Sequence, residues 1–131
     1  MKVTKRVGDV MKDDFAVVDG LITVAEAIRI ARDKHIKALV VDKRDENDEY
    51  GLVLMNDIAK KVLSQNRSPE RVNIYEIMTK PALGVSANMN VKYCARLFER
   101  FGISRAPVID NGEVLGVVSY NSIVMYGMLS D

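Results

Sequence analysis

The stretch Lys37-Ala38-Leu39-Val40-Val41-Asp42 recurs later in the chain as Arg105-Ala106-Pro107-Val108-Ile109-Asp110. Each copy is an apolar run of strand length that follows a basic residue and ends at an aspartate. The similarity continues outward from both copies, through the pairs Val10-Met11 and Ile77-Met78, Val18 and Val85, Val24 and Val91, Arg29 and Arg96, and Gly51-Leu52-Val53-Leu54 and Gly116-Val117-Val118-Ser119. The spacing is 67 residues before the two strands, 68 within them and 65 after them. The chain is therefore a tandem repeat, which we divide into residues 1–66 and 67–131.

A helix is predicted to follow a short extended segment in each repeat, and these segments are Phe15–Val18 and Ala82–Val85. Thr23-Val24-Ala25-Glu26 has the spacing of a capping box, and Asn90 is a favourable N-cap residue at the matching place. Apolar residues then recur at i, i+3, i+4 and i+7, which predicts one buried stripe on each helix. The two stripes are Val24, Ala27, Ile28 and Ala31, and Val91, Cys94, Ala95 and Phe98.

A β-hairpin and a second helix complete each repeat. The strands Ala38–Val41 and Ala106–Ile109 lead into a charged turn at 43–49 and into Asn111-Gly112-Glu113, where Asn-Gly favours a tight turn. Closing helices are predicted at 56–63 and 121–128. The predicted fold is mixed α/β (α+β), with β-α-β-β-α written twice and pseudo-two-fold symmetry. A repeat of about 65 residues is marginal alone, so we expect the two sheets to pack face to face around a shared cleft, with 64–70 as the linker.

The composition of the chain argues against several classes of function. The chain has 131 residues and a net charge of +1, so it lacks the basic field that drives non-specific binding to nucleic acid or membranes. One cysteine, Cys94, and one histidine, His35, cannot form an internal disulfide or a Cys/His zinc site. We expect Cys94 to be a small core residue and the protein to be cytoplasmic, with no leader peptide, no metal and no membrane partner.

The chain repeats a β-α-β-β-α unit, and the two repeats have the openings Val10-Met11 and Ile77-Met78. Together with the 105–110 strand and the turn Gly116-Val117-Val118-Ser119, these features resemble the CBS (cystathionine beta-synthase) domain family. The resemblance extends from about Val7 to Leu129 and implies a tandem pair, or Bateman module. Members of this family are regulatory modules that bind AMP, ADP, ATP or related adenosyl ligands between paired units. The resemblance therefore implies a stand-alone, non-catalytic sensor of adenine nucleotides, with S-adenosylmethionine as another ligand of this class and no covalent cofactor.

In this family the turn Gly-x-x-Ser/Thr-x-x-Asp places a carboxylate against the ribose hydroxyls. The first repeat keeps the carboxylate, Asp57, but has Leu54 at the hydroxyl position, whereas the second keeps Ser119 but has Ser122 at the carboxylate position. We favour Asp57 for the ribose, because a charged acceptor makes the stronger hydrogen bonds. Both motifs are also ordinary helix caps, and the two roles can coexist.

The helix starts Asn56, Tyr120 and Asn121 offer backbone N–H groups to a phosphate, and the Tyr120 ring is a candidate for base stacking or for a subunit contact. The resemblance assigns the phosphate to Lys37 and Arg105 at the starts of the central strands, with a surface cation as the alternative for each. His35 is most simply an exposed residue without function. Candidates for the base, which are otherwise core residues, are Ala16, Val17, Val18, Ala82, Leu83 and Val85.

Two other functions remain open. One is a structural module without ligand that dimerises through Met125, Tyr126, Met128 and Leu129 near the C-terminus. The other is nucleic-acid binding, which some family members perform and against which the charge of +1 argues. A sensor would also need a regulated protein partner, and nothing in the residues identifies it.

Overall fold

The computed structural model describes residues 2–129, which form two compact units. The continuous unit is Asp14–Ala82, and the discontinuous unit joins the segment up to Asp13 to the chain from Leu83 onward. The boundary that we placed between residues 66 and 67 separates the sequence repeats. The compact units instead divide the chain after residue 13 and after residue 82. They differ because each unit is completed by the opening segment of the other repeat.

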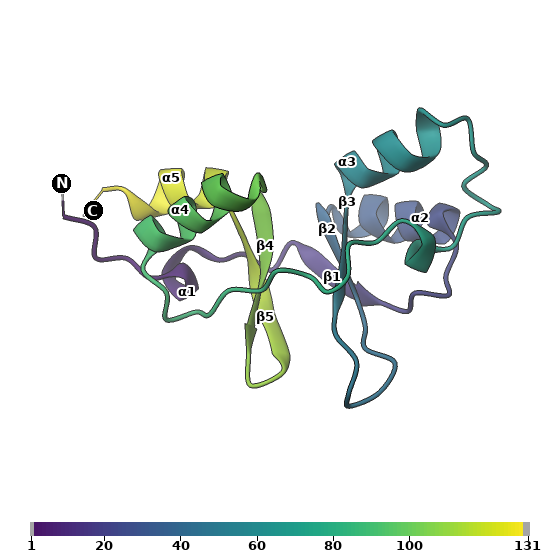
Figure 1. The fold of residues 1–131 in the computed structure, drawn as a ribbon. Coiled ribbons are helices and arrows are strands. Elements are labelled where there is room, and N and C mark those ends of the chain that lie inside the picture. Colours follow the sequence, from purple (N-terminus) through teal and green to yellow (C-terminus); the bar gives the residue numbers. More distant parts are fainter. Residues whose placement is uncertain (1, 130–131) are drawn as a thin grey trace. The chain divides into compact units, whose positions relative to one another are not determined.

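The continuous unit has a three-stranded sheet in the order β1-β2-β3. Strand β1 runs parallel to β2, and β2 runs antiparallel to β3. Helices α2 and α3 lie on one face of this sheet (Figure 1). The elements are β1 (Phe15–Val18), α2 (Val24–Lys34), β2 (Ala38–Val41), β3 (Gly51–Leu54) and α3 (Met55–Ile58), which continues as a π-helical turn (Ala59–Leu63), followed by a 3₁₀ turn (Ile74–Glu76).

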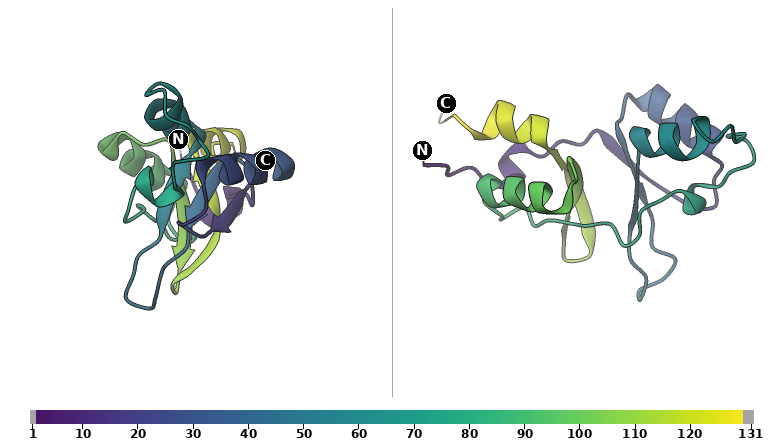
Figure 2. Two further views of the ribbon diagram at one scale, coloured as in Figure 1. Left: turned by 90° about the vertical axis from the view of Figure 1, so that its right-hand side faces the viewer. Right: turned by 45° about the horizontal axis from the view of Figure 1, so that its top comes forward.

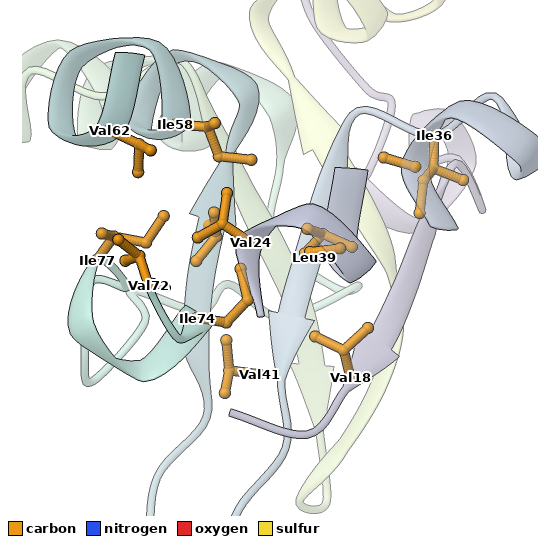
Figure 3. Packing of buried hydrophobic residues seen from close by; sticks show 13 residues of the cluster. Val18, Val24, Ile36, Leu39, Val41, Ile58, Val62, Val72, Ile74 and Ile77 are labelled. Atoms are coloured by element: carbon orange, nitrogen blue, oxygen red, sulfur yellow. The ribbon is translucent and has the colours of Figure 1, made fainter. Parts of the chain in front are cut away.

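The core of the continuous unit takes residues from both repeats (Figure 3). Val72, Ile74 and Ile77 come from the second repeat, and they are buried beside strand and helix residues of the first. Two backbone hydrogen bonds anchor this segment, from the N–H of Val24 to the Val72 carbonyl (2.8 Å) and from the N–H of Ile74 to the Ile22 carbonyl (2.9 Å). The chain after the predicted linker is therefore part of this unit.

The discontinuous unit has a two-stranded antiparallel sheet, β4-β5. The N-terminal helix α1 lies beside α5 (Figure 2), and the N–H of Val7 donates to the Met89 carbonyl over 2.8 Å. Phe98, Cys94 and Val91 form the centre of the core together with Val7. The elements are α1 (Val7–Val10), α4 (Val91–Phe101), β4 (Arg105–Asp110), β5 (Glu113–Ser119) and α5 (Tyr120–Gly127).

The mixed α/β class, the caps and the hairpin turns are confirmed. Thr23 Oγ1 accepts the N–H of Glu26 over 3.1 Å, and Asn90 Oδ1 accepts the N–H of Lys92 over 2.8 Å. Asn111 and Gly112 have φ angles of 54° and 77°, as a tight hairpin turn with two central residues of positive φ requires.

The extended segment predicted at Ala82–Val85 is wrong as a full strand. Only Val85 pairs, in a parallel bridge to Val108. The Val85 N–H donates to the Pro107 carbonyl, and the Val85 carbonyl accepts the N–H of Ile109. The Pro107 nitrogen faces the same edge but carries no hydrogen, so the ladder cannot continue toward Leu83.

The strand pairing also corrects the repeat spacing. Val18 pairs with Val41, and Val85 pairs with Val108, so equivalent residues remain 67 apart through β2 and β4. Arg105 therefore corresponds to Ala38, and the prediction that it matches Lys37 is wrong. The apolar run misled the alignment because all four residues of β2 are buried, which leaves no alternation to fix the register.

Candidate functional site

Asp57 lies in the first turn of α3. Its Oδ2 accepts the backbone N–H of Leu54 over 2.8 Å, which is the helix-cap role considered above. The carboxylate is half-buried, and its Oδ1 has no hydrogen-bond donor within the described residues. The cap therefore fixes one oxygen of the carboxylate and leaves the other available.

The equivalent turn of the discontinuous unit is closed on itself. Ser119 Oγ accepts the N–H of Ser122 over 3.2 Å, and Ser122 Oγ accepts the N–H of Ser119 over 3.1 Å. Ser122 also donates to the Ser119 carbonyl and is only 1% exposed. Ser122 is thus a buried cap residue, and the structure does not support its predicted role as a ligand contact.

The two predicted cations have different surroundings. Lys37 is exposed, and its backbone N–H donates to the Asp14 carbonyl over 3.1 Å. It precedes Ala38, which pairs with Leu54, so Lys37 and Asp57 lie at the same end of the continuous unit's sheet. Arg105 is half-buried in the discontinuous unit and pairs directly with Ser119 across β4 and β5.

The predicted helix-start residues are mostly exposed. Asn56 and Asn121 face solvent. The Tyr120 ring packs edge-on against Phe98, with 5.2 Å between the ring centroids, and its backbone N–H donates to the Ser104 carbonyl. Tyr120 therefore contacts the core residue Phe98, although 36% of its own surface is exposed.

The apolar candidates divide between core and surface. Val18 and Val85 are buried core residues, and Ala16 packs against the core of the continuous unit. Val17 and Leu83 are exposed. Ala82 is half-buried, and its N–H donates to the Tyr50 carbonyl over 2.8 Å.

The structure contains a cavity of about 790 Å³ that the sequence interpretation missed. It lies within the continuous unit, where the ends of β1 and β2 meet the 43–44 turn and residues 75–80. Val17 and Val18 are the predicted site residues that line it, and they lie at the sheet end opposite to Asp57. The only sequence signal was the set of exposed apolar and charged residues at 17–21 and 43–44, which is typical of any loop.

His35 and Cys94 have structural roles. His35 ends α2 in the left-handed conformation (φ 54°), and its N–H caps the Ala31 carbonyl. Cys94 is fully buried, and this burial raises the pKa of its thiol to about 11, which agrees with a core residue. Across residues 2–129, no helix is long and apolar enough to cross a membrane.

The chain belongs to the CBS domain family. The family model matches it twice, over residues 7–64 and 74–128. Its fold is similar to that of the hexameric CBS-CP12 protein from bloom-forming cyanobacteria, with a TM-score of 0.90 and 35% identity over 94% of this chain and 71% of that one. The fold is also similar to that of the CBS domain pair of protein MJ0100, which was solved in complex with 5′-methylthioadenosine and S-adenosyl-L-methionine. The TM-score is 0.77 and the sequence identity is 28%, over 95% of both chains.

The curated relatives are longer than this chain. An uncharacterized protein from Methanopyrus kandleri is 29% identical over 119 residues, which are 90% of this chain and 60% of that protein. A homoserine O-acetyltransferase from Methanosalsum zhilinae is 31% identical over 118 residues, but these make up only 23% of its length. The similarity to this enzyme is thus limited to about a quarter of it.

Proposed function

We propose that the chain is a non-catalytic regulatory module that binds an adenosyl ligand, either an adenine nucleotide (AMP, ADP or ATP) or S-adenosylmethionine, at the Asp57 end of the continuous unit. The observation that carries the proposal is the Asp57 carboxylate, which one hydrogen bond to Leu54 holds in place while its Oδ1 stays available. A fixed carboxylate is a strong acceptor for the two ribose hydroxyls. The adenosyl ligands in the MJ0100 pair support this ligand class.

Lys37 is the proposed phosphate partner at this site, because it is exposed at the same sheet end as Asp57. Ala16, at the start of the sheet, and Asn56 complete the proposed group. Arg105 and Ser119 form a second group, which lacks a carboxylate because Ser122 occupies that position. We therefore assign the tighter ribose contact to Asp57. To act as a sensor, the module must bind its ligand with different affinity in two states.

The test is isothermal titration calorimetry of the whole chain with AMP, ADP, ATP, S-adenosylmethionine and 5′-methylthioadenosine. At least one ligand should bind saturably, and Asp57→Ala should weaken it at least about tenfold, because two hydrogen bonds to a charged acceptor are lost. Asp9→Ala is the matched control, since Asp9 Oδ2 accepts the Arg6 N–H over the same 2.8 Å at the start of α1. The proposal fails if no ligand binds, or if both alanine variants weaken binding equally.

A structural role in self-association is the second candidate function, and the surface of α5 and the residues after it favours it. Met125 is 65% exposed, and Val124, Tyr126, Met128 and Leu129 are exposed beside it. Exposed apolar residues that gather in one segment can mark a subunit contact. Light scattering should give a dimer mass at micromolar concentration, and Met125→Glu should give the monomer. A monomeric unmodified chain would contradict this role.

A further inference from the structure

The cavity of the continuous unit has the dimensions of a site for a small organic molecule, since such sites enclose about 300–1,000 Å³. It lies where Val18 pairs with Val41 and Val41 pairs with Gly51, at the sheet end opposite to Asp57 and Lys37. A ligand there would not compete with one at Asp57. The cavity is therefore separate from the proposed nucleotide site.

One wall of the cavity is apolar but exposed. Val17, Leu21 and Tyr75 have exposed fractions of 47%, 73% and 51%, and all three line the cavity. The Tyr75 N–H donates to the Gly20 carbonyl over 2.9 Å, which holds the Tyr75 backbone against the loop that carries Leu21. Single exposed apolar residues are common, but three around one concave surface favour contact with the apolar part of a ligand.

The rim of the cavity carries an oriented guanidinium group. Arg44 Nε donates to Asp48 Oδ2 over 3.1 Å, and Lys80 Nζ donates to the same oxygen over 2.8 Å. The Arg44 backbone N–H also donates to it, over 2.9 Å. Because Arg44 uses only Nε, its two terminal amino groups make no hydrogen bond to any residue in 2–129. Such a pair of donors matches the two oxygens of a carboxylate, and Lys43 adds a neighbouring positive charge.

Two carboxylates limit the charge that the cavity can accept. Asp19 Oδ1 accepts the Leu21 N–H and Asp42 Oδ1 accepts the Lys43 N–H, each over 2.8 Å, and both residues line the cavity. Their charges oppose a polyphosphate, because like charges at close range repel. They therefore disfavour a ligand with several negative charges, although Lys43, Arg44 and Lys80 at the same cavity can attract one anionic group.

From these contacts we propose that the cavity binds an organic acid with one ring and a single negative charge. The ring packs against Tyr75, Val17 and Leu21, and the anionic group accepts hydrogen bonds from Arg44. This ligand class differs from an adenine nucleotide both in size and in charge.

The test is an NMR titration of the ¹⁵N-labelled whole chain with phenylacetate, with acetate (no ring) and phenethylamine (opposite charge) as comparison ligands. Phenylacetate should cause saturable shifts at residues 17–21, 41–44 and 75–80, while the two comparison ligands should not saturate there. Arg44→Gln should weaken phenylacetate binding at least about fivefold, through loss of charged hydrogen bonds.

Leu21→Glu should abolish this binding, whereas Leu63→Glu, a change at an equally exposed leucine outside the cavity, should leave it intact. The proposal is overturned if phenylacetate causes no saturable shifts at the cavity, if acetate or phenethylamine saturates there as well as phenylacetate, or if Leu21→Glu and Leu63→Glu behave alike. A titration with AMP, followed in the same way, tests binding at the Asp57 end of the sheet. Absence of binding at one site can therefore be told apart from absence of binding at the other.

Discussion

The two units are built from one repeated sequence, yet the continuous unit has three strands and the discontinuous unit has two. The difference depends on one backbone N–H. Val40 pairs with Val17 in the complete sheet, whereas its counterpart Pro107 has no N–H for the neighbouring segment. The discontinuous unit instead has the larger core residue, Phe98, where the other unit has Ala31. Similar sequences thus reach similar folds through different balances of backbone pairing and side-chain packing.

The same comparison applies to the candidate site. Asp57 and Ser122 occupy equivalent positions, and both accept the backbone N–H three residues earlier. The carboxylate keeps a second oxygen available, whereas the serine is buried and has no second acceptor. One side-chain difference therefore leaves an open polar group in only one of the two turns.

The largest effect is expected from dividing the chain. A fragment of residues 1–66 lacks Val72, Ile74 and Ile77, and each of these buried side chains contributes about 1.5–3 kcal/mol of burial. We expect that fragment to be unfolded and the fragment 14–82 to retain its sheet. Circular dichroism and amide chemical-shift dispersion distinguish the two outcomes. A folded 1–66 would show that residues 72–77 are dispensable.

A smaller effect is expected at the core residue that distinguishes the discontinuous unit. Phe98→Ala removes a fully buried ring and its edge-on contact with Tyr120, and should lower the free energy of unfolding by about 3–5 kcal/mol. Phe101→Ala on the same helix is the control, because Phe101 is exposed. Urea denaturation measures both. Equal losses would contradict the difference in burial between Phe98 and Phe101.

The equivalent glycines Gly51 and Gly116 should respond unequally to alanine. A Cβ at Gly116 would lie 2.9 Å from the backbone carbonyl oxygen of Lys12, whereas a Cβ at Gly51 would lie 2.7 Å from the sulfur of the Met78 side chain. A thioether can rotate away, but a paired backbone cannot. Gly116→Ala should therefore cost about 1–3 kcal/mol and Gly51→Ala less, as measured by urea denaturation. The reverse order would show that the Met78 side chain is the more rigid neighbour.

The smallest effect concerns the long hairpin loop, which the tight Asn111-Gly112 turn replaces in the other unit. Hydrogen bonds from the Lys80 side chain and the Arg44 backbone hold the pKa of Asp48 well below its usual range. A carboxyl with a lowered folded pKa stabilises the protein above its unfolded pKa of about 3.9, and this contribution is lost as the pH falls. As the pH falls from about 5 to 2, the Asp48→Asn variant should therefore lose less stability than the chain without this substitution. Thermal melts at a series of pH values measure the difference. An unchanged pH profile would contradict the role of these bonds.

Local signals in the sequence predicted local structure well. The Thr23 and Asn90 caps and the Asn111-Gly112 turn form as expected, because short-range hydrogen bonds and backbone preferences determine them. The exchange of opening segments was not predictable, because it depends on which of the two cores buries Val7 and Ile74. Apolar periodicity shows that a residue is buried, but it does not identify the residues that pack against it. The cavity at Arg44 was missed for the same reason, since its walls come from loops that are distant in the sequence.

The division of the chain into a continuous and a discontinuous unit has a consequence for biosynthesis. Residues 14–82 contain every segment of their unit, so this unit can fold once its last residues have left the ribosome. The other unit needs residues from both sides of this segment, so it cannot close until residues well beyond Leu83 have also been made. Helix α1 emerges before residues 14–82 but must wait for its packing partner α5, which emerges after them.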